Sequence, residues 1–145
     1  MRYLVTGSQM RAIDQDTIQN IGIPSLVLME RAAECVARKA EQLCDQKTLQ
    51  ILAICGVGNN GADGVAAARM LYLHGFDVLV VVVGNEAHAT KEFEVQKGIA
   101  EKLEIPVVDL EHFLHGEDEQ KAGDCAIIDA VFGVGLSRDV EGTYA

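Results

Sequence analysis

The segment at residues 56–64, GVGNNGADG, constrains the fold of this chain more than any other feature. It follows a short apolar run at 49–55 and precedes an alanine-rich apolar run. A glycine turn between a buried strand and a helix N-terminus is typical of phosphate-binding loops, because glycine lets the backbone approach the ligand and the free helical N–H groups face an anion. The loop also carries side-chain oxygens on Asn59, Asn60 and Asp63, which a plain phosphate cradle does not need.

Apolar periodicity along the chain predicts an alternation of strands and helices. Two helices precede the first strand, one opened by a capping box at residues 6–9 and one that starts at Ser25. Six successive apolar residues at 78–83 indicate a strand buried on both faces, as in a parallel sheet. The remaining predicted elements are strands at 49–55, 106–108 and 125–131, helices near 62–74 and 89–103, and a loop or short helix at 111–124.

This alternation predicts an α/β fold: a Rossmann-like, doubly wound, mainly parallel sheet with helices on both faces. Right-handed crossovers favour the strand order 3-2-1-4, in which strands one and four are neighbours and the order reverses between them. Ligands bind at the carboxyl ends of the strands that flank such a switch point, so we expect the glycine loop and the segment after strand four to meet there. Residues 1–145 are expected to form a single domain that is truncated at its C-terminus, because no element completes the strand-four side of the sheet.

Asp129 stands within an otherwise apolar strand, and we expect it to be buried at the switch point. Because an ionised carboxylate is rarely buried without a partner or a metal, we interpret the residue as a ligand-binding or catalytic carboxylate. The alternative is a structural aspartate that caps the backbone of the glycine loop. The next segment, residues 133–139, is a candidate second anion-binding turn with Arg138 on a phosphate; the alternative is a surface loop with a solvated arginine.

The net charge of −10 argues against binding to a nucleic-acid backbone, which needs clustered Lys and Arg. It does not exclude an anionic small ligand held by backbone N–H groups. The longest apolar run, 78–83, is far too short to cross a bilayer, and no signal peptide is recognisable. The four cysteines lack C-x-x-C spacing and the four histidines lack metal-ligand spacing, so we expect reduced core thiols in a cytoplasmic protein and solvated histidines at 112 and 115.

Residues 56, 58 and 61 match the spacing of the dinucleotide-binding fingerprint, G-x-G-x-x-G. Its usual companion is an acidic residue at the end of strand two, where it binds a ribose hydroxyl. Here strand two is followed by Gly84 and Asn85, and Glu86 comes late, which argues against a standard NAD dehydrogenase. A purely structural alternative is a tight strand–helix turn with Asn59 as the helix N-cap.

Three segments, in the right order, resemble the YjeF N-terminal domain, the family of NAD(P)HX epimerases. Residues 56–64 are similar to the signature loop of that family, and residues 129–138, DAVFGVGLSR, are similar to its second motif. The resemblance covers essentially the whole chain. The first region agrees as well, with Met10, Asp14, GIP at 22–24 and LMERA at 28–32.

This resemblance implies a Rossmann-like homodimer that epimerises the C6 hydroxyl of hydrated NADH and NADPH, so that a partner dehydratase can restore the cofactor. It implies a potassium ion held by Asn60 and Asp129, and we take Asp129 as the candidate acid/base for the chemistry at C6. A nearby cation lowers the pKa of an aspartate, which suits a base better than an acid. The substrate-binding residues that it implies are Asn59, Asn60, Gly61, Ala62 and Asp63 in the first loop and Gly133, Val134, Gly135, Leu136, Ser137, Arg138 and Asp139 in the second.

The chain departs from the family pattern at several positions. Val134 stands where threonine is usual and lacks a hydroxyl that could contact phosphate, and Asp139, where proline is common, adds a negative charge near the phosphates. The main alternative function is non-enzymatic, because YjeF-like domains also serve as dimerisation scaffolds in RNA-decay proteins. Retention of Asn60, Asp63 and Asp129 together favours the enzyme. Excess apolar residues on the first two helices predict that these helices form the interface of a two-fold homodimer.

Overall fold

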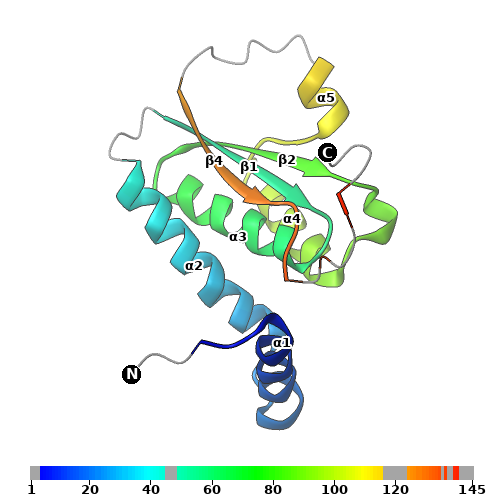
Figure 1. The fold of residues 1–145 in the computed structure, drawn as a ribbon. Coiled ribbons are helices and arrows are strands. Elements are labelled where there is room, and N and C mark those ends of the chain that lie inside the picture. Colours follow the sequence, from blue (N-terminus) through cyan, green and yellow to red (C-terminus); the bar gives the residue numbers. More distant parts are fainter. Residues whose placement is uncertain (1–3, 45–48, 116–123, 135, 137–138, 141–145) are drawn as a thin grey trace.

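A computed structural model of the chain describes residues 4–44, 49–115, 124–134, 136 and 139–140. Its centre is a four-stranded parallel sheet in the order β3-β2-β1-β4, which confirms the predicted order (Figure 1). The strands are β1 (Gln50–Gly56), β2 (Asp77–Val83), β3 (Val107–Asp109) and β4 (Cys125–Ala130). The helices are α1 (Gly7–Asp16), the π-helical turn η1 (Thr17–Ile21), α2 (Ser25–Leu43), α3 (Asn59–Leu73), the 3-10 turn η2 (Glu86–His88), α4 (Lys91–Lys102) and α5 (Leu110–His115).

All four strands are parallel, so their carboxyl ends lie along one edge of the sheet. Gly56 at the end of β1 pairs in register with Val83 at the end of β2, and Cys55 pairs with Ala130 at the end of β4. The glycine loop after β1 and the segment after β4 therefore start next to each other. This arrangement is the switch point at which a doubly wound sheet binds its ligands.

Helix α3 lies against the sheet and supplies much of the core, with residues 65–68 fully buried. Its small side chains let the helix approach β1 and β4 closely. A β-carbon added to Gly61 would lie 1.6 Å from the carbonyl oxygen of Gly56, and one added to Gly64 would lie 2.4 Å from the Cβ of Ala130. Both glycines are thus required for close packing of helix on strand, the role of the third glycine in a dinucleotide-binding turn.

The start of α3 differs from the prediction. The helix begins at Asn59 rather than near residue 62, and its N-cap is Gly58, so the suggestion of Asn59 as N-cap is wrong. The reason is the contact of Gly61 with Gly56, which leaves no length for a longer loop between strand and helix. As a consequence, Asn59 and Asn60 lie in the first helical turn, and their side chains are free for contacts other than capping.

Helices α2, α3 and α4 cover one face of the sheet, and α5 lies over the other (Figure 1). A polar cluster joins the three helices on the first face; within it Gln96 is buried, whereas the side chain of Glu30 is partly exposed. Glu30 of α2 accepts hydrogen bonds from Nη2 of Arg69 at 2.5 and 2.7 Å and from Nε2 of Gln96, which is 1% exposed, at 3.0 Å. Desolvation raises the pKa of Glu30, but the hydrogen bonds from Gln96 and Arg69 and the charge of Arg69 outweigh it and lower the pKa overall.

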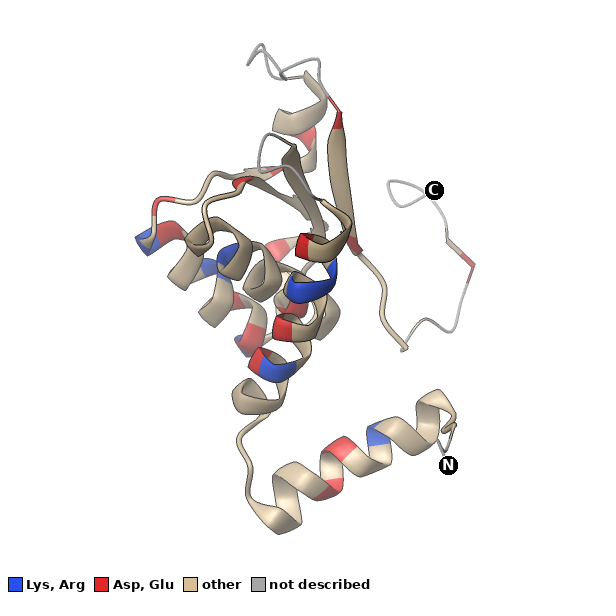
Figure 2. Cartoon of the chain, turned by 90° about the vertical axis from the view of Figure 1, so that its left-hand side faces the viewer, with Lys and Arg blue, Asp and Glu red and all other residues tan. Residues whose placement is uncertain are grey.

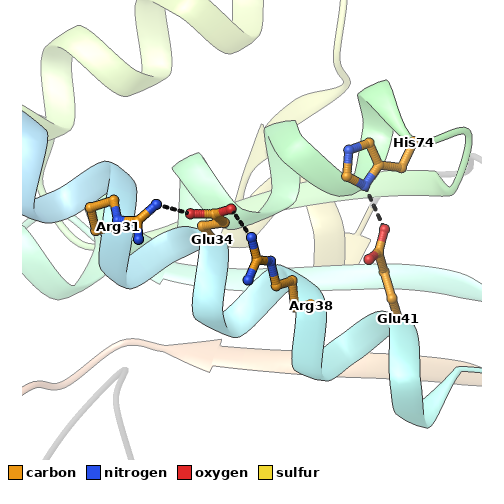
Figure 3. Close-up of polar contacts among 5 residues, drawn as sticks. All are labelled: Arg31, Glu34, Arg38, Glu41 and His74. Atoms are coloured by element: carbon orange, nitrogen blue, oxygen red, sulfur yellow. Dashed lines mark hydrogen bonds and ion pairs between the residues drawn. The ribbon is translucent and has the colours of Figure 1, made fainter.

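A second set of polar contacts lies on the outer side of α2 (Figure 3). Nδ1 of His74, at the C-terminal end of α3, lies 2.5 Å from Oε1 of Glu41 and links the two helices. Glu34 accepts a hydrogen bond from Arg31 at 2.8 Å and another from Arg38 along α2. Exposed ion pairs of this kind contribute at most about 1 kcal/mol each, so the cluster at Glu30, which includes the buried Gln96, matters more for stability.

Helix α1 and the turn η1 stand apart from the body of the sheet (Figures 1 and 2). Thr6 and Gln9 form the predicted capping box, with the Thr6 hydroxyl accepting from the Gln9 N–H and the Gln9 side chain accepting from the Thr6 N–H. No residue of either element is buried. Their exposed apolar side chains are Met10, Ile13, Ile18 and Ile21, the last of them 67% exposed.

The four cysteines are all free, but they do not all lie in the core. Cys44 and Cys55 are buried, as predicted, whereas the prediction is wrong for Cys35 and Cys125. Cys35 stands on the outer side of α2, and Cys125 is the first residue of a strand at the edge of the described sheet. Within the described part of the chain, no helix has both the length and the apolar character needed to cross a bilayer.

Candidate functional site

The two motifs meet at the carboxyl ends of β1 and β4. Nδ2 of Asn60, in the first turn of α3, donates a hydrogen bond to the carbonyl oxygen of Phe132 at 3.0 Å. A β-carbon added to Gly133 would lie 3.1 Å from the Cβ of Asn60, closer than an ordinary van der Waals contact, so the backbone at Gly133 approaches this side chain closely. Segments more than 70 residues apart in the sequence therefore lie side by side, and this adjacency, predicted from the strand order, is confirmed.

Helix α1 forms a third side of the site, which the sequence analysis missed. Nη2 of Arg11 donates a hydrogen bond to the carbonyl oxygen of Val134 at 3.3 Å. A β-carbon added to Gly7 would lie 3.5 Å from the Cβ of Val134. Arg11 thus brings a cation to the second motif of a strongly acidic chain. The sequence feature that could have indicated this contact is that Arg11 is the one basic residue among residues 7–16.

Asp63 is the carboxyl group of the site with the most distinctive electrostatics. It is half-buried, and its pKa is raised from 3.8 to about 6, first by desolvation and second by the negative charge of Asp14 on α1. A carboxyl group with a pKa near 6 is suited to donate or accept a proton near neutral pH. From the sequence, Asp63 was expected only to bind ligand, and its raised pKa was not predicted.

Asp129 is exposed, so the prediction of a buried carboxylate is wrong. Successive side chains of β4 point to opposite faces of the sheet. Ala130 faces α3 and packs against Gly64, whereas Asp129 lies on the other face with Ile127, which is 59% exposed. An apolar sequence suggested burial on both faces, but β4 is at the edge of the described sheet. Oδ1 of Asp129 accepts a hydrogen bond from the backbone N–H of Val131 at 3.1 Å, which orients the carboxyl group at the strand end.

The other predicted binding residues fall into three groups. In the first loop Asn59 is exposed, whereas Gly61 and Ala62 are buried, and the N–H of Ala62 donates to the carbonyl oxygen of Gly58 at 3.0 Å. In the second motif the N–H of Leu136 donates to the carbonyl oxygen of Gly133 at 3.2 Å and closes a turn. The exposed residues of that motif are Gly133, Val134, Leu136 and Asp139, and those outside the described residues are Gly135, Ser137 and Arg138.

These features agree with a site for an anionic, polar ligand. The N-cap of α3 is Gly58, which has no side chain to cap the helix, so the first N–H groups of the helix are available to an anion. A β-carbon on Gly58 would meet no atom within 4 Å, so there is open space beside it. Within the described ranges, no three His, Cys, Asp or Glu side chains gather as metal ligands.

Comparison with known proteins gives three findings. A family model described as YjeF-related protein N-terminus matches residues 25–145. The chain is 45% identical over 141 residues to the NAD(P)H-hydrate epimerase of Limosilactobacillus fermentum, a match that covers 97% of this chain and 64% of that protein. It is 39% identical over 141 residues to the NAD(P)H-hydrate epimerase of Oenococcus oeni, covering 97% and 64% respectively.

In fold, the chain is similar to the crystal structure of the yeast protein ynu0 (YNL200c). The TM-score is 0.81 at 23% sequence identity, and the match covers 99% of this chain and 62% of that chain. This likeness establishes the fold as that of a known α/β protein. The chain spans about 64% of the length of the curated relatives named above.

Proposed function

The chain belongs to the family of YjeF-related protein N-termini, and we propose that it epimerises the C6 hydroxyl of hydrated NADH and NADPH. Relatives at 45% and 39% identity carry the name NAD(P)H-hydrate epimerase, which supports this activity. The observation that carries the proposal is the contact between Asn60 and Phe132. It joins the N-terminus of α3, whose free N–H groups suit an anion, to the segment that follows Asp129. A dinucleotide offers such a site both a diphosphate and a ring.

Inversion at C6 requires a proton donor and a proton acceptor. A carboxyl group protonates the C6 hydroxyl, and the C6–O bond breaks with loss of water. The ring that remains carries a positive charge shared between C6 and the ring nitrogen. A water molecule then attacks C6 from the opposite ring face and gives its extra proton to a carboxylate. Asp129 remains our candidate acid/base, and Asp63, with a pKa of about 6, is suited to share this role.

We further propose that a potassium ion binds between Asn60 and Asp129. Because Nδ2 of Asn60 donates to Phe132, its Oδ1 remains as an oxygen ligand, and Asp129 offers an exposed carboxylate. Amide and carboxylate oxygens are donors that suit a large monovalent cation. When bound, the ion would supply positive charge beside the diphosphate and the carboxylates.

The direct test is to follow the interconversion of R-NADHX and S-NADHX by chromatography, with a protein-free sample as the reference. We expect Asp129→Asn to lower the rate at least ~10²-fold, the scale of a lost general acid/base. Asp124→Asn is the matched control, since Asp124 is exposed at the opposite end of β4. A wild-type rate no faster than the protein-free sample would instead support the scaffold function.

The exposed apolar side chains of α1 and η1 support a homodimer, which we propose is built on these elements. Ile13 and Ile21 lie on elements without a buried residue, and an apolar surface of this kind usually marks an interface. A two-fold dimer would cover the same surface on both copies. We also propose that the product serves a dehydratase that accepts one epimer, and that the protein acts in the cytoplasm, in keeping with its four free cysteines.

A further inference from the structure

A separate hollow lies at the same carboxyl edge of the sheet, beyond β2 and β3. Its volume is about 630 Å³, within the range of small-molecule sites. It is bordered by the ends of both strands and by α5, which lies over the sheet face opposite α3 (Figure 1). The lining residues used below are Val82, Asn85, Asp109, Leu110, Glu111 and Leu114.

Asp109 puts a carboxylate where the fingerprint in the sequence lacks one. It is the last residue of β3 and pairs in register with Val82, the penultimate residue of β2. Its side chain is exposed, and Oδ1 accepts the backbone N–H of His112 at 2.6 Å, which fixes the orientation of the group. The acidic residue expected at the end of the second strand is thus supplied by the neighbouring strand.

The lining of the hollow fits a nucleoside better than a phosphate. Val82, Leu110 and Leu114 give it apolar walls against which a flat base can lie. Asp109 and Asn85 are polar groups near the strand ends, and a carboxylate oxygen is a good acceptor for ribose hydroxyls. With Glu111 also on its border, the hollow carries negative charge, which repels a phosphate group.

The hollow is within reach of a ligand held at the first turn of α3. Neighbouring strands lie ~4.8 Å apart, so β3 is about 10 Å from β1 along the sheet edge. The backbone N–H of Thr90 donates to the carbonyl oxygen of Val57 at 3.0 Å, so the segment after β2 is joined to the loop after β1. A dinucleotide whose diphosphate lies at Asn59–Asp63 can therefore direct one half toward β4 and the other toward β3.

We propose that this hollow holds the adenosine half of the dinucleotide, with Asp109 accepting a hydrogen bond from a ribose hydroxyl, so that the chain prefers NADHX over NADPHX. The 2′-phosphate of the NADPH series would face the carboxylates of Asp109 and Glu111. This inference rests on the proposed function, because it assigns the second half of the same substrate.

The test measures binding of ADP-ribose and of 2′-phospho-ADP-ribose by calorimetry, since both probes carry the adenosine half and neither can be epimerised. We expect ADP-ribose to bind about tenfold more tightly, a difference of about 1.4 kcal/mol. Asp109→Asn can still accept the His112 N–H, so α5 is retained while the charge is lost. In that variant the preference should fall to about threefold or less. Asp77→Asn, at the amino end of β2, is the control and should leave the preference unchanged.

The outcomes separate this proposal from the epimerase function. Equal binding of the two probes, absence of binding, or a preference unchanged by Asp109→Asn would overturn the adenosine site even if the protein epimerises NADHX. An Asp109-dependent preference for ADP-ribose supports the site even if the epimerisation assay shows no activity.

Discussion

Replacement of Asp63 by asparagine is expected to stabilise the protein at neutral pH. Asp63 is half-buried beside the charge of Asp14, and its pKa of about 6 lies above the unfolded value of 3.8. A raised pKa means that the folded state binds the proton more tightly than the unfolded state. Its favourable contribution is therefore complete below pH 3.8 and is lost as the pH rises through 6. Above that pH the folded chain carries an ionised carboxylate at a position where the neutral form is more stable.

The rise of the Asp63 pKa from 3.8 to about 6 corresponds to about 3 kcal/mol at neutral pH before any screening by solvent. Solvent screens a half-exposed group, so we take roughly 1–2 kcal/mol as the expected gain in the free energy of unfolding. The gain should shrink at pH 4.5 to roughly half to two thirds of its value at pH 7.5, because part of the penalty then disappears by protonation.

Urea denaturation of wild type and Asp63→Asn at pH 7.5 and 4.5 measures both quantities. Asp14→Asn should give a smaller gain at pH 7.5, since it removes the second cause of the shift and leaves the desolvation. Asp124→Asn, at an exposed position, should change little. The reasoning is refuted if Asp63→Asn is neutral or destabilising at pH 7.5, or if its effect is the same at both pH values.

Three further predictions concern packing and assembly. Gly64→Ala should lower the free energy of unfolding by about 1–3 kcal/mol in thermal melting, because the new methyl group would lie 2.4 Å from the Cβ of Ala130. The control is Gly98→Ala, which should be neutral or slightly stabilising because nothing lies within 4 Å of the added carbon. Glu30→Leu should lower the free energy of unfolding by about 2–4 kcal/mol in urea denaturation, because it leaves polar groups of Arg69 and Gln96 without their partner. The control, Glu34→Leu, should lower it by less than about 1 kcal/mol, and equal effects of the two substitutions would contradict the importance of the Glu30 cluster. Ile21→Asp should convert the proposed dimer to a monomer, as measured by light scattering. The control is Leu73→Asp, at an exposed position of α3, which should leave the dimer intact. A wild-type protein that is monomeric at all concentrations would rule the interface out.

Local sequence patterns were sufficient to predict the α/β fold and the adjacency of the two glycine-containing loops. The six apolar residues of β2 indicated burial on both faces, and right-handed crossovers then placed β1 beside β4. The contact of Asn60 with Phe132 follows from that order, because the carboxyl ends of adjacent parallel strands lie together. These features depend on periodicity and chain handedness, which a single sequence carries.

The electrostatics of the site were decided by the tertiary structure. Asp129 was expected to be buried because its neighbours are apolar, but its pleat face at the edge of the described sheet leaves it exposed. Conversely, the sequence indicated only a binding role for Asp63, and its raised pKa comes from the loss of solvent and the approach of Asp14, which the tertiary structure determines. Burial and charge–charge distance depend on how separate elements pack. The order of residues along the chain therefore predicted which two loops meet, whereas the burial of Asp63 and the approach of Asp14 on α1 determined which carboxyl group has a raised pKa.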